Sequence, residues 1–244
     1  MTENPNGSVS IVIPAYAEER RIKRAVLELS ALAKSFPRLK EILLIVEPSG
    51  DATAAVARQA AGDSPIVRVQ ETAEHRGKGF AIREGMMRAT GDIVFFMDAD
   101  LSVPLRHVAS FVAHLEAHPE TAIAIGCRRH PQSIIRVRQH FLREQAGRMF
   151  NRVVRLLWLS RSKDTQCGFK AFRRSAAREI FSRVRLEGFA FDVEALLIAH
   201  HLRRRVEELP VEWINDRDTK FRSFRDGWRS FRDLLRLRFR RDFS

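Results

Sequence analysis

Two periods of apolar residues alternate along the first hundred residues of the chain. Short apolar runs at residues 9–13, which Pro14 closes, and at 41–46, 66–69 and 93–97 have the length and composition of buried strands. Between them, apolar residues recur every three or four positions, through Ile22, Val26, Leu29 and Leu32, then over residues 54–61 and 80–89, and this spacing predicts helices. The repeated units indicate an α/β fold with a Rossmann-like, mostly parallel sheet, right-handed crossovers and helices on both faces.

The residues after the first strand argue against two common nucleotide-binding classes. Neither GxGxxG nor GxxxxGK[ST] follows this strand, which counts against a dinucleotide enzyme and a P-loop NTPase. The sequence there is Pro14-Ala15-Tyr16-Ala17-Glu18-Glu19. We expect Tyr16 near a nucleotide base or ribose. Two roles are open to Glu18: a hydrogen bond to a sugar hydroxyl, or capping of a helix that begins near Arg21.

Two carboxylates flank one residue where the strand at 93–97 ends, in the sequence Asp98-Ala99-Asp100. Open α/β sheets bind ligands at the carboxyl ends of their strands. Mg²⁺ and Mn²⁺ take oxygen ligands, commonly one or two carboxylates together with substrate phosphates. The pair therefore predicts a metal site against a diphosphate, and the alternative is an ordinary turn that ends the strand.

A lysine between two glycines, in Gly77-Lys78-Gly79, is a second candidate phosphate contact. Its neighbours lack side chains, so Lys78 can approach a phosphate closely. A solvated turn lysine is the equal alternative.

Composition and charge add an anionic partner to this picture. The 244 residues are 45% hydrophobic, enough for one substantial core, and carry a formal net charge of +13. The excess lies between Arg128 and Lys163 and after Arg217. Cys127 and Cys167 lack metal-ligand spacing, and residues 1–8 lack an apolar core. We therefore expect a reducing, cytoplasmic setting, no signal peptide and no membrane span.

The tail beyond residue 215 predicts a basic amphipathic helix. An apolar stripe runs through Phe221, Phe224, Trp228, Phe231, Leu234 and Leu235, with Arg238 at the same spacing, and Arg222, Arg225, Arg229, Arg232 and Arg236 occupy the other faces. Such helices lie in the interface of anionic membranes. We therefore divide the chain into a catalytic domain at 1–215 and a membrane-interfacial helix at 216–244. Packing of the stripe on the core is the alternative.

Six segments, in order along nearly the whole chain, resemble family 2 glycosyltransferases of the GT-A fold, in the dolichyl-phosphate glucosyltransferase and mannosyltransferase branch. They are residues 9–16 (VSIVIPAY), 75–83 (HRGKGFAIR), 98–102 (DADLS), 164–170 (DTQCGFK), 191–194 (FDVE) and 209–213 (LPVEW). TQCGF and FDVE look more like the glucosyl-transferring members.

This resemblance implies a nucleotide-sugar donor and a divalent metal, Mg²⁺ or Mn²⁺. It assigns Asp100 as the stronger metal ligand, with Asp98 towards the ribose or the metal. It places the nucleotide against Pro14, Ala15, Tyr16, Glu18, Lys78 and Asp98, and a sugar or acceptor pocket at Thr165, Gln166, Cys167 and Gly168. UDP-glucose is the favoured donor and GDP-mannose is possible.

The turn after the second strand departs from the family pattern. Family members have an Asp-Asp-Gly-Ser type of turn whose acidic residue reads the base, whereas this chain has Glu47-Pro48-Ser49-Gly50-Asp51. We expect Glu47 to substitute as the acceptor that reads the base.

A polyprenyl phosphate acceptor, implied by the same resemblance, changes what catalysis requires. A phosphomonoester is mostly dianionic at neutral pH, so no general base need deprotonate it. It needs cations, and arginine offers a bidentate fork; we assign Arg128, Arg136 and Arg143. Asp192 is expected to orient the sugar or acceptor, with a structural carboxylate at a helix N-terminus as the alternative.

The function expected from the sequence is therefore inverting, metal-dependent transfer of a hexose, glucose in view of the branch, to a polyprenyl or dolichyl phosphate. The protein is expected to be peripheral on the cytoplasmic face of a membrane. One alternative keeps the donor chemistry with a soluble acceptor. A less favoured one is a non-enzymatic nucleic-acid-binding protein.

Overall fold

The computed structural model describes residues 7–137, 162–214, 232, 233 and 237. Its helices are α1 (Glu19–Ser35), α2 (Thr53–Ala61), α3 (Lys78–Arg88), α4 (His107–Ala117), α6 (Arg174–Phe181) and α7 (Phe191–His201). Its strands are β1 (Val9–Ala15), β2 (Leu39–Val46), β3 (Val67–Glu71), β4 (Ile93–Met97), β5 (Thr121–Cys127), β6 (Ile134–Val137), β7 (Phe169–Arg173), β8 (Arg205–Pro210) and β9 (Glu212–Ile214).

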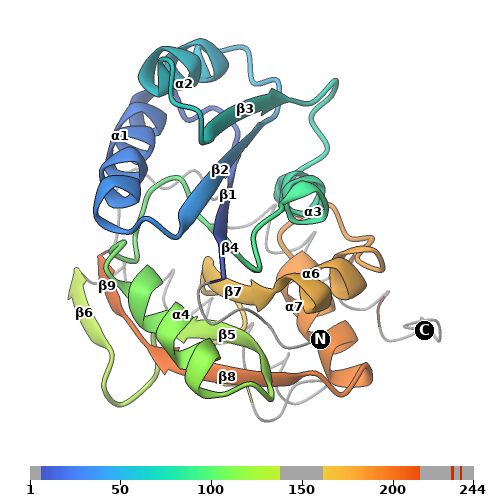
Figure 1. The fold of residues 1–244 in the computed structure, drawn as a ribbon. Helices are drawn as coiled ribbons and strands as arrows, with labels where there is room; N and C mark the ends of the chain where they lie inside the picture. Colours follow the sequence, from blue (N-terminus) through green and yellow to red (C-terminus); the bar gives the residue numbers. More distant parts are fainter. Residues whose placement is uncertain (1–6, 138–161, 215–231, 234–236, 238–244) are drawn as a thin grey trace.

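Seven of these strands form one sheet in the order β3-β2-β1-β4-β7-β5-β8 (Figure 1). All neighbouring pairs are parallel except those of β7, which runs antiparallel to β4 and to β5. Strands β6 and β9 form a separate parallel pair beside the sheet. The α/β class and the mostly parallel sheet expected from the sequence are confirmed.

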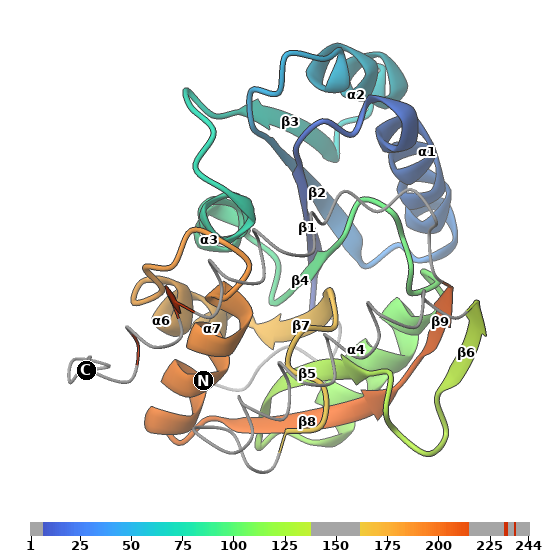
Figure 2. The same cartoon turned by 180° about the vertical axis from the view of Figure 1, so that it is seen from behind.

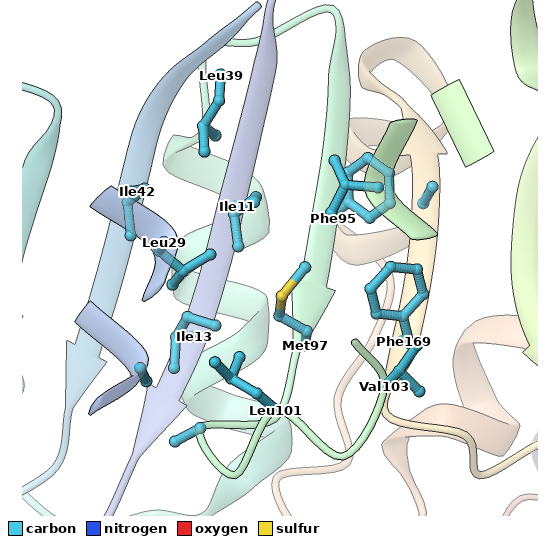
Figure 3. Packing of buried hydrophobic residues seen from close by; sticks show 14 of the residues in the cluster. Ile11, Ile13, Leu29, Leu39, Ile42, Phe95, Met97, Leu101, Val103 and Phe169 are labelled. Carbon is cyan, nitrogen blue, oxygen red and sulfur yellow. The ribbon is translucent and has the colours of Figure 1, made fainter. Parts of the chain in front are cut away.

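Helices cover both faces of the sheet, as seen from opposite sides in Figures 1 and 2. Successive strand residues point to opposite faces, so Phe96 joins the cluster with α3, α6 and α7, whereas Phe95 joins the cluster with α1, α2 and α4. Figure 3 shows the second cluster, in which Ile11 and Leu29 pack together and Phe95 lies near Phe169. Strands buried on both faces explain the continuous apolar runs of the sequence.

The elements predicted up to residue 97 are present, with small shifts at their ends. Strand β4 has the bounds predicted for it, whereas β1 continues through Pro14 to Ala15, paired with Ile45 and Val46 of β2. Helix α1 begins at Glu19 rather than near Arg21.

The amino-terminal edge of the sheet is held by one buried carboxylate, Glu41 of β2. The Ser10 hydroxyl donates to it at 2.6 Å, and the Thr90 N–H donates at 2.9 Å. An Arg68 guanidinium nitrogen lies 3.2 Å from its other oxygen. This network joins β1, β2, β3 and the turn before β4 at the end of the sheet away from the Asp98-Ala99-Asp100 segment.

The amphipathic tail lies mostly outside the described residues. Of residues 216–244 the structure describes Arg232, Asp233 and Leu237. Leu237 is buried in the cluster that contains α6 and α7. In the described part of the chain, every helix is too short or too polar to span a bilayer.

Candidate active site

A pocket of about 120 Å³ opens at the carboxyl ends of the strands. Its lining includes Asp98, Asp100 and Ser102 after β4, Gln166 and Gly168 before β7, Arg128 after β5, and Trp213 of β9. The antiparallel direction of β7 explains this meeting, since its amino end lies beside the carboxyl end of β4 and Met97 pairs with Phe169. Acidic, basic and aromatic side chains from four segments therefore share one cavity.

Asp98 is fixed from two sides. Its carboxylate oxygen Oδ1 lies 2.6 Å from the Lys78 ammonium, and its backbone N–H donates to the Gly168 carbonyl at 3.2 Å. A Cβ at position 168 would overlap Oδ2 of Asp98, so only glycine leaves space for this carboxylate. Gly168, the glycine of the TQCG segment, thus leaves the space that the Asp98 carboxylate occupies.

Asp100 lies in the tight turn that follows. The Ser102 N–H donates to its Oδ1 at 2.9 Å, and Leu101 between them has φ of 52°, a left-handed conformation that costs free energy for a branched residue. Burial raises the pKa of Asp100, and the negative charge of Asp98 raises it further. A cation between the two carboxylates would favour their charged forms and would therefore lower the pKa of Asp100 again.

The donor set fits Mg²⁺ or Mn²⁺ bound together with a phosphate ligand. Asp98 and Asp100 offer carboxylate oxygens into one pocket, and no third acidic, histidine or cysteine side chain joins them in the described part of the chain. Such a site leaves coordination positions for water and diphosphate oxygens, which is the usual mode of Mg²⁺ binding with nucleotides.

Lys78 opens helix α3, and its glycine neighbours have a packing role. A Cβ at Gly77 would lie 2.6 Å from the Glu187 carbonyl oxygen, and Gly77 has φ of 125°, which side chains rarely adopt. A Cβ at Gly79 would overlap the carbonyl oxygen of Leu186. These glycines let the turn lie against the loop before α7. Attraction from Asp98 and other carboxylates outweighs burial and raises the pKa of Lys78, so the ammonium stays charged.

Glu47 is buried directly after β2 and holds the same turn. Its carboxylate accepts hydrogen bonds from the backbone N–H groups of Arg76 at 2.8 Å and Gly77 at 2.9 Å, and it lies 2.9 Å from Nδ1 of His75. The ring of His75 stacks on Tyr16, with centroids 3.9 Å apart. The structure thus brings Glu47 and Tyr16 together through His75, a residue to which the sequence assigned no separate role.

Glu18 occupies the N-cap position of α1 without a side-chain capping bond. Its carboxylate accepts from the Arg21 guanidinium at 2.7 and 2.9 Å. The capping alternative is therefore wrong for the Glu18 side chain, because this carboxylate pairs with Arg21 instead. Pro14 and Ala15 form the end of β1, just before this turn.

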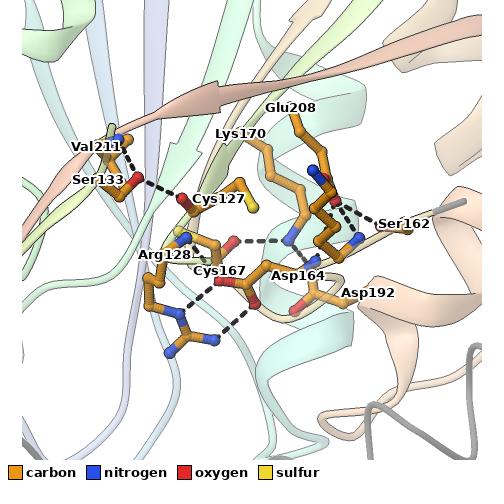
Figure 4. Close-up of polar contacts among 11 residues, drawn as sticks. Cys127, Arg128, Ser133, Ser162, Asp164, Cys167, Lys170, Asp192, Glu208 and Val211 are labelled. Carbon is orange, nitrogen blue, oxygen red and sulfur yellow. Dashed lines mark hydrogen bonds and ion pairs between the residues drawn. The ribbon is translucent and has the colours of Figure 1, made fainter. Parts of the chain in front are cut away.

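Arg128 is held in one orientation by the buried Asp164. Nε and Nη2 of its guanidinium donate to the two carboxylate oxygens at 2.7 and 2.8 Å, as Figure 4 shows, and the group lies 5.5 Å from the centre of the Trp213 ring. Burial disfavours a charged Asp164, but Arg128 outweighs it and lowers the pKa of that carboxyl. Glu208 of β8 fixes the loop by accepting from the Asp164 N–H at 3.0 Å.

The other two arginines assigned to phosphate differ from Arg128. Arg136 is exposed on β6 and donates to Glu212 at 3.1 Å, outside the pocket lining. Arg143 lies outside the described residues.

The loop before β7 carries the remaining residues assigned to the sugar or acceptor pocket. Thr165 and Cys167 are buried, whereas Gln166 and Gly168 line the pocket. Both cysteine thiols of the chain are free, and burial raises the pKa of Cys127 and of Cys167 to about 12.

Asp192, in the first turn of α7, is buried and lies 2.5 Å from the ammonium of Lys170. Sequence reasoning missed Lys170 as a separate participant. The signal that could have found it is a lysine among Phe169, Ala171 and Phe172, because such a pattern indicates a buried charge.

Comparisons with known proteins identify the family of this chain. Residues 10–181 match the sequence model of the family described as Glycosyl transferase family 2. A dolichyl-phosphate beta-glucosyltransferase of Drosophila melanogaster is 33% identical over 97% of this chain and 76% of its own length. The Homo sapiens protein of the same name is 32% identical over 98% of this chain and 77% of its own length.

A solved structure has the same fold. The glucosyl-3-phosphoglycerate synthase of Mycobacterium tuberculosis, in complex with Mn²⁺, uridine diphosphate and phosphoglyceric acid, superposes with a TM-score of 0.72. The alignment covers 96% of this chain and 79% of that one at 17% identity, so it shows the GT-A fold alone. The family model spans most of the sequence and the relatives align along nearly all of it; the chain is a glycosyltransferase that belongs to family 2.

Proposed function

We propose that the chain transfers a glucosyl unit from UDP-glucose to a polyprenyl phosphate of the dolichyl type, with inversion at the anomeric carbon. One observation carries the proposal: the acidic pair and the guanidinium of Arg128 line the same pocket. A donor diphosphate at the carboxylates and an acceptor phosphate at the arginine would then meet across the sugar. The names of the relatives, dolichyl-phosphate beta-glucosyltransferases, support the choice of both substrates.

On the donor side, Asp98 and Asp100 would hold Mg²⁺ or Mn²⁺, which neutralises charge on a departing diphosphate. Lys78, 2.6 Å from Asp98, is placed to contact the same phosphates at the amino end of α3. Pro14, Ala15, Tyr16, Glu18 and Glu47 surround the nucleotide in this proposal. Both carboxylate oxygens of Glu47 already bond to His75 and to two backbone N–H groups. We therefore assign Glu47 an indirect role in reading the base, in which it holds the turn that would contact the nucleotide.

On the acceptor side, Arg128 presents its guanidinium to the pocket in an orientation that Asp164 fixes. A dianionic phosphate needs such positioning rather than deprotonation, so a general base has no required role. Arg136 and Arg143 would extend the cationic path. Gln166 and Gly168 would form part of the pocket wall, with the buried Thr165 and Cys167 behind them. Asp192 would orient the sugar or the acceptor.

Exposed aliphatic side chains on the β6 and β9 pair support a lipid acceptor over a soluble one. Ile135 is 38% exposed and pairs with the pocket residue Trp213, so the two side chains lie on the same face of this pair. Ile134 and Ile214, 49% and 41% exposed, directly precede and follow these two residues and point to the opposite face. Exposed apolar side chains next to a pocket can mark ligand or membrane contacts. An isoprenoid chain attached to the phosphate would find apolar contacts there.

The assay that tests the proposal uses UDP-[¹⁴C]glucose, Mn²⁺ and polyprenyl phosphate in detergent, followed by organic extraction. We expect label in the organic phase that requires the metal. GDP-[¹⁴C]mannose serves as the competing donor and phosphoglycerate as a soluble acceptor. Label that stays in the aqueous phase with every acceptor lipid contradicts the lipid substrate, and label from GDP-mannose alone contradicts the donor.

We further propose that the protein attaches peripherally to the cytoplasmic face of a membrane through residues 216–244. The support is the basic, apolar-striped sequence of this segment. Leu237, which the structure describes, is buried against the catalytic domain and would keep the segment close to it. Flotation with anionic vesicles at low salt tests this attachment, and a chain that remains at the bottom of the gradient contradicts it.

A further inference from the structure

Lys170 places a positive charge in the core, on the face of the sheet where Phe96 and Phe172 pack against α3, α6 and α7. Its side chain is 1% exposed. Its Nζ lies 5.0 Å from the centre of the ring of Phe96, the residue with which Lys170 pairs in β4. An ammonium is costly to bury, and an apolar side chain of the same length would fit an environment of aromatic rings.

The ammonium joins two segments of the site, as Figure 4 shows. It donates to the Cys167 carbonyl at 2.7 Å and to Oδ1 of Asp192 at 2.5 Å. The first contact fixes the loop whose next residue, Gly168, lies against Asp98. The second fixes the carboxylate in the first turn of α7.

A second lysine continues the arrangement on the pocket side. Burial raises the pKa of Asp192, and the positive charges of Lys170 and Lys78 oppose this rise. Lys78 in turn pairs with Asp98. Positive and negative side chains therefore alternate from the sheet interior towards the acidic pair. A charge at the inner end of such a series holds its neighbours in place without contact with substrate.

We propose that Lys170 is a positioning residue for transfer: its buried ammonium holds the Asp192 carboxylate and the Cys167 carbonyl in the orientation that the reacting sugar requires. The inference rests on the proposed function, because it assigns Asp192 to the sugar or acceptor. Lys170 acts through Asp192, and small displacements of a positioned group lower turnover by about 100-fold.

The test is a double-mutant cycle on kcat with Lys170→Met, Asp192→Asn and both together. We expect each single change to lower kcat by about 100-fold, and the double change to lower it no more than about threefold beyond Asp192→Asn alone. KM for UDP-glucose should stay within about threefold, because the donor-binding residues remain. Lys170→Met with kcat near the wild type, or losses that multiply in the double variant, would overturn the inference.

Three further variants separate positioning from folding. Glu41→Gln perturbs a buried carboxylate at the opposite edge of the sheet, and it should lower the thermal midpoint while kcat stays unchanged. If Lys170→Met does not fold, Lys170→Met with Asp192→Leu removes both buried charges and is compared with Asp192→Leu. Equal kcat values of these two variants support the inference, and multiplied losses overturn it.

The two proposals fail differently. Absence of transfer by the wild type contradicts the proposed function. Equal turnover by the wild type and Lys170→Met contradicts positioning alone.

Discussion

At the amino-terminal edge of the sheet, Glu41 is surrounded by donors from Ser10, Thr90 and Arg68. At the carboxyl-terminal edge, Asp98 and Asp100 face a pocket, and the pKa of Asp100 is raised by burial and by its acidic neighbour. The first edge encloses one carboxylate among protein donors, whereas the second places two carboxylates together in a cavity. The difference indicates that one edge stabilises the fold and the other is arranged for a cationic ligand.

Asp100→Ala should break the functional edge most strongly. We expect transfer to fall by about 1000-fold, because the remaining carboxylate holds the metal and diphosphate poorly. The thermal midpoint without ligand should not fall, since burial and Asp98 already disfavour this charge. Initial rates with labelled donor and thermal unfolding with and without Mn²⁺ and UDP measure both effects. A variant that keeps its activity contradicts the metal assignment.

Gly168→Ala tests the same edge by filling the space beside Asp98, without removing a charge. A new Cβ would overlap Oδ2 of Asp98 and must displace it. We expect the affinity for UDP in the presence of Mn²⁺, measured by calorimetry, to fall by about 30-fold. Gly188→Ala is the matched control, since its nearest neighbour would be 3.8 Å away. Equal affinities of the two variants would show that Asp98 tolerates displacement.

Glu41→Gln addresses the stabilising edge. Donors from Ser10 and Thr90 would face a weaker acceptor, and Arg68 would lose its counter-charge. We expect a loss of about 1.5 kcal/mol in the free energy of unfolding, read from urea denaturation, with unchanged kcat. A fall in kcat of the folded protein would show that the edges are coupled.

The smallest expected effect is that of Asp51. This acidic residue lies near the functional edge but has a structural role, like Glu41 at the other edge. Burial raises its pKa, but hydrogen bonds from Thr53 and Ser49 outweigh this and lower the pKa to about 2. Its contribution is therefore present above the unfolded value of 3.8 and is lost as pH falls through about 2. Because Asp51 is exposed, we expect less than about 1 kcal/mol.

Urea denaturation of the wild type and of Asp51→Asn, from a pH above 3.8 down to about 2, measures this contribution. The advantage of the wild type should shrink towards the acid end. A constant difference across the range contradicts the assignment.

Periodicity predicted the first half of the fold because each element there is local in sequence. The bounds of β4 follow from its run of consecutive apolar residues, whereas β1 extends past Pro14, which the sequence suggested as its end. The place of β7 between β4 and β5 depends instead on pairs far apart in the chain, such as Ile123 with Phe172. Local spacing carries no information on such pairing.

The residues of the site likewise fall into those that local sequence predicts and those that depend on the folded chain. The place of Asp98 and Asp100 at one end of the sheet could be predicted from the sequence, because both directly follow one strand. The partners of Arg128 and Asp192 could not, since they reach these side chains only through the folded sheet. The glycines around Lys78 were expected to give access to phosphate, and their additional role in packing against the loop before α7 is visible only in three dimensions.

The two buried thiols can be used to measure local opening of the protein. Cys127 ends β5 and Cys167 lies in the pocket loop, and these are the only cysteines in the sequence. A thiol reagent can reach either one only when its surroundings open, so the labelling rate measures the free energy of that opening. A ligand that closes on the pocket should therefore slow the labelling of Cys167 and give a binding signal that needs neither turnover nor an added probe.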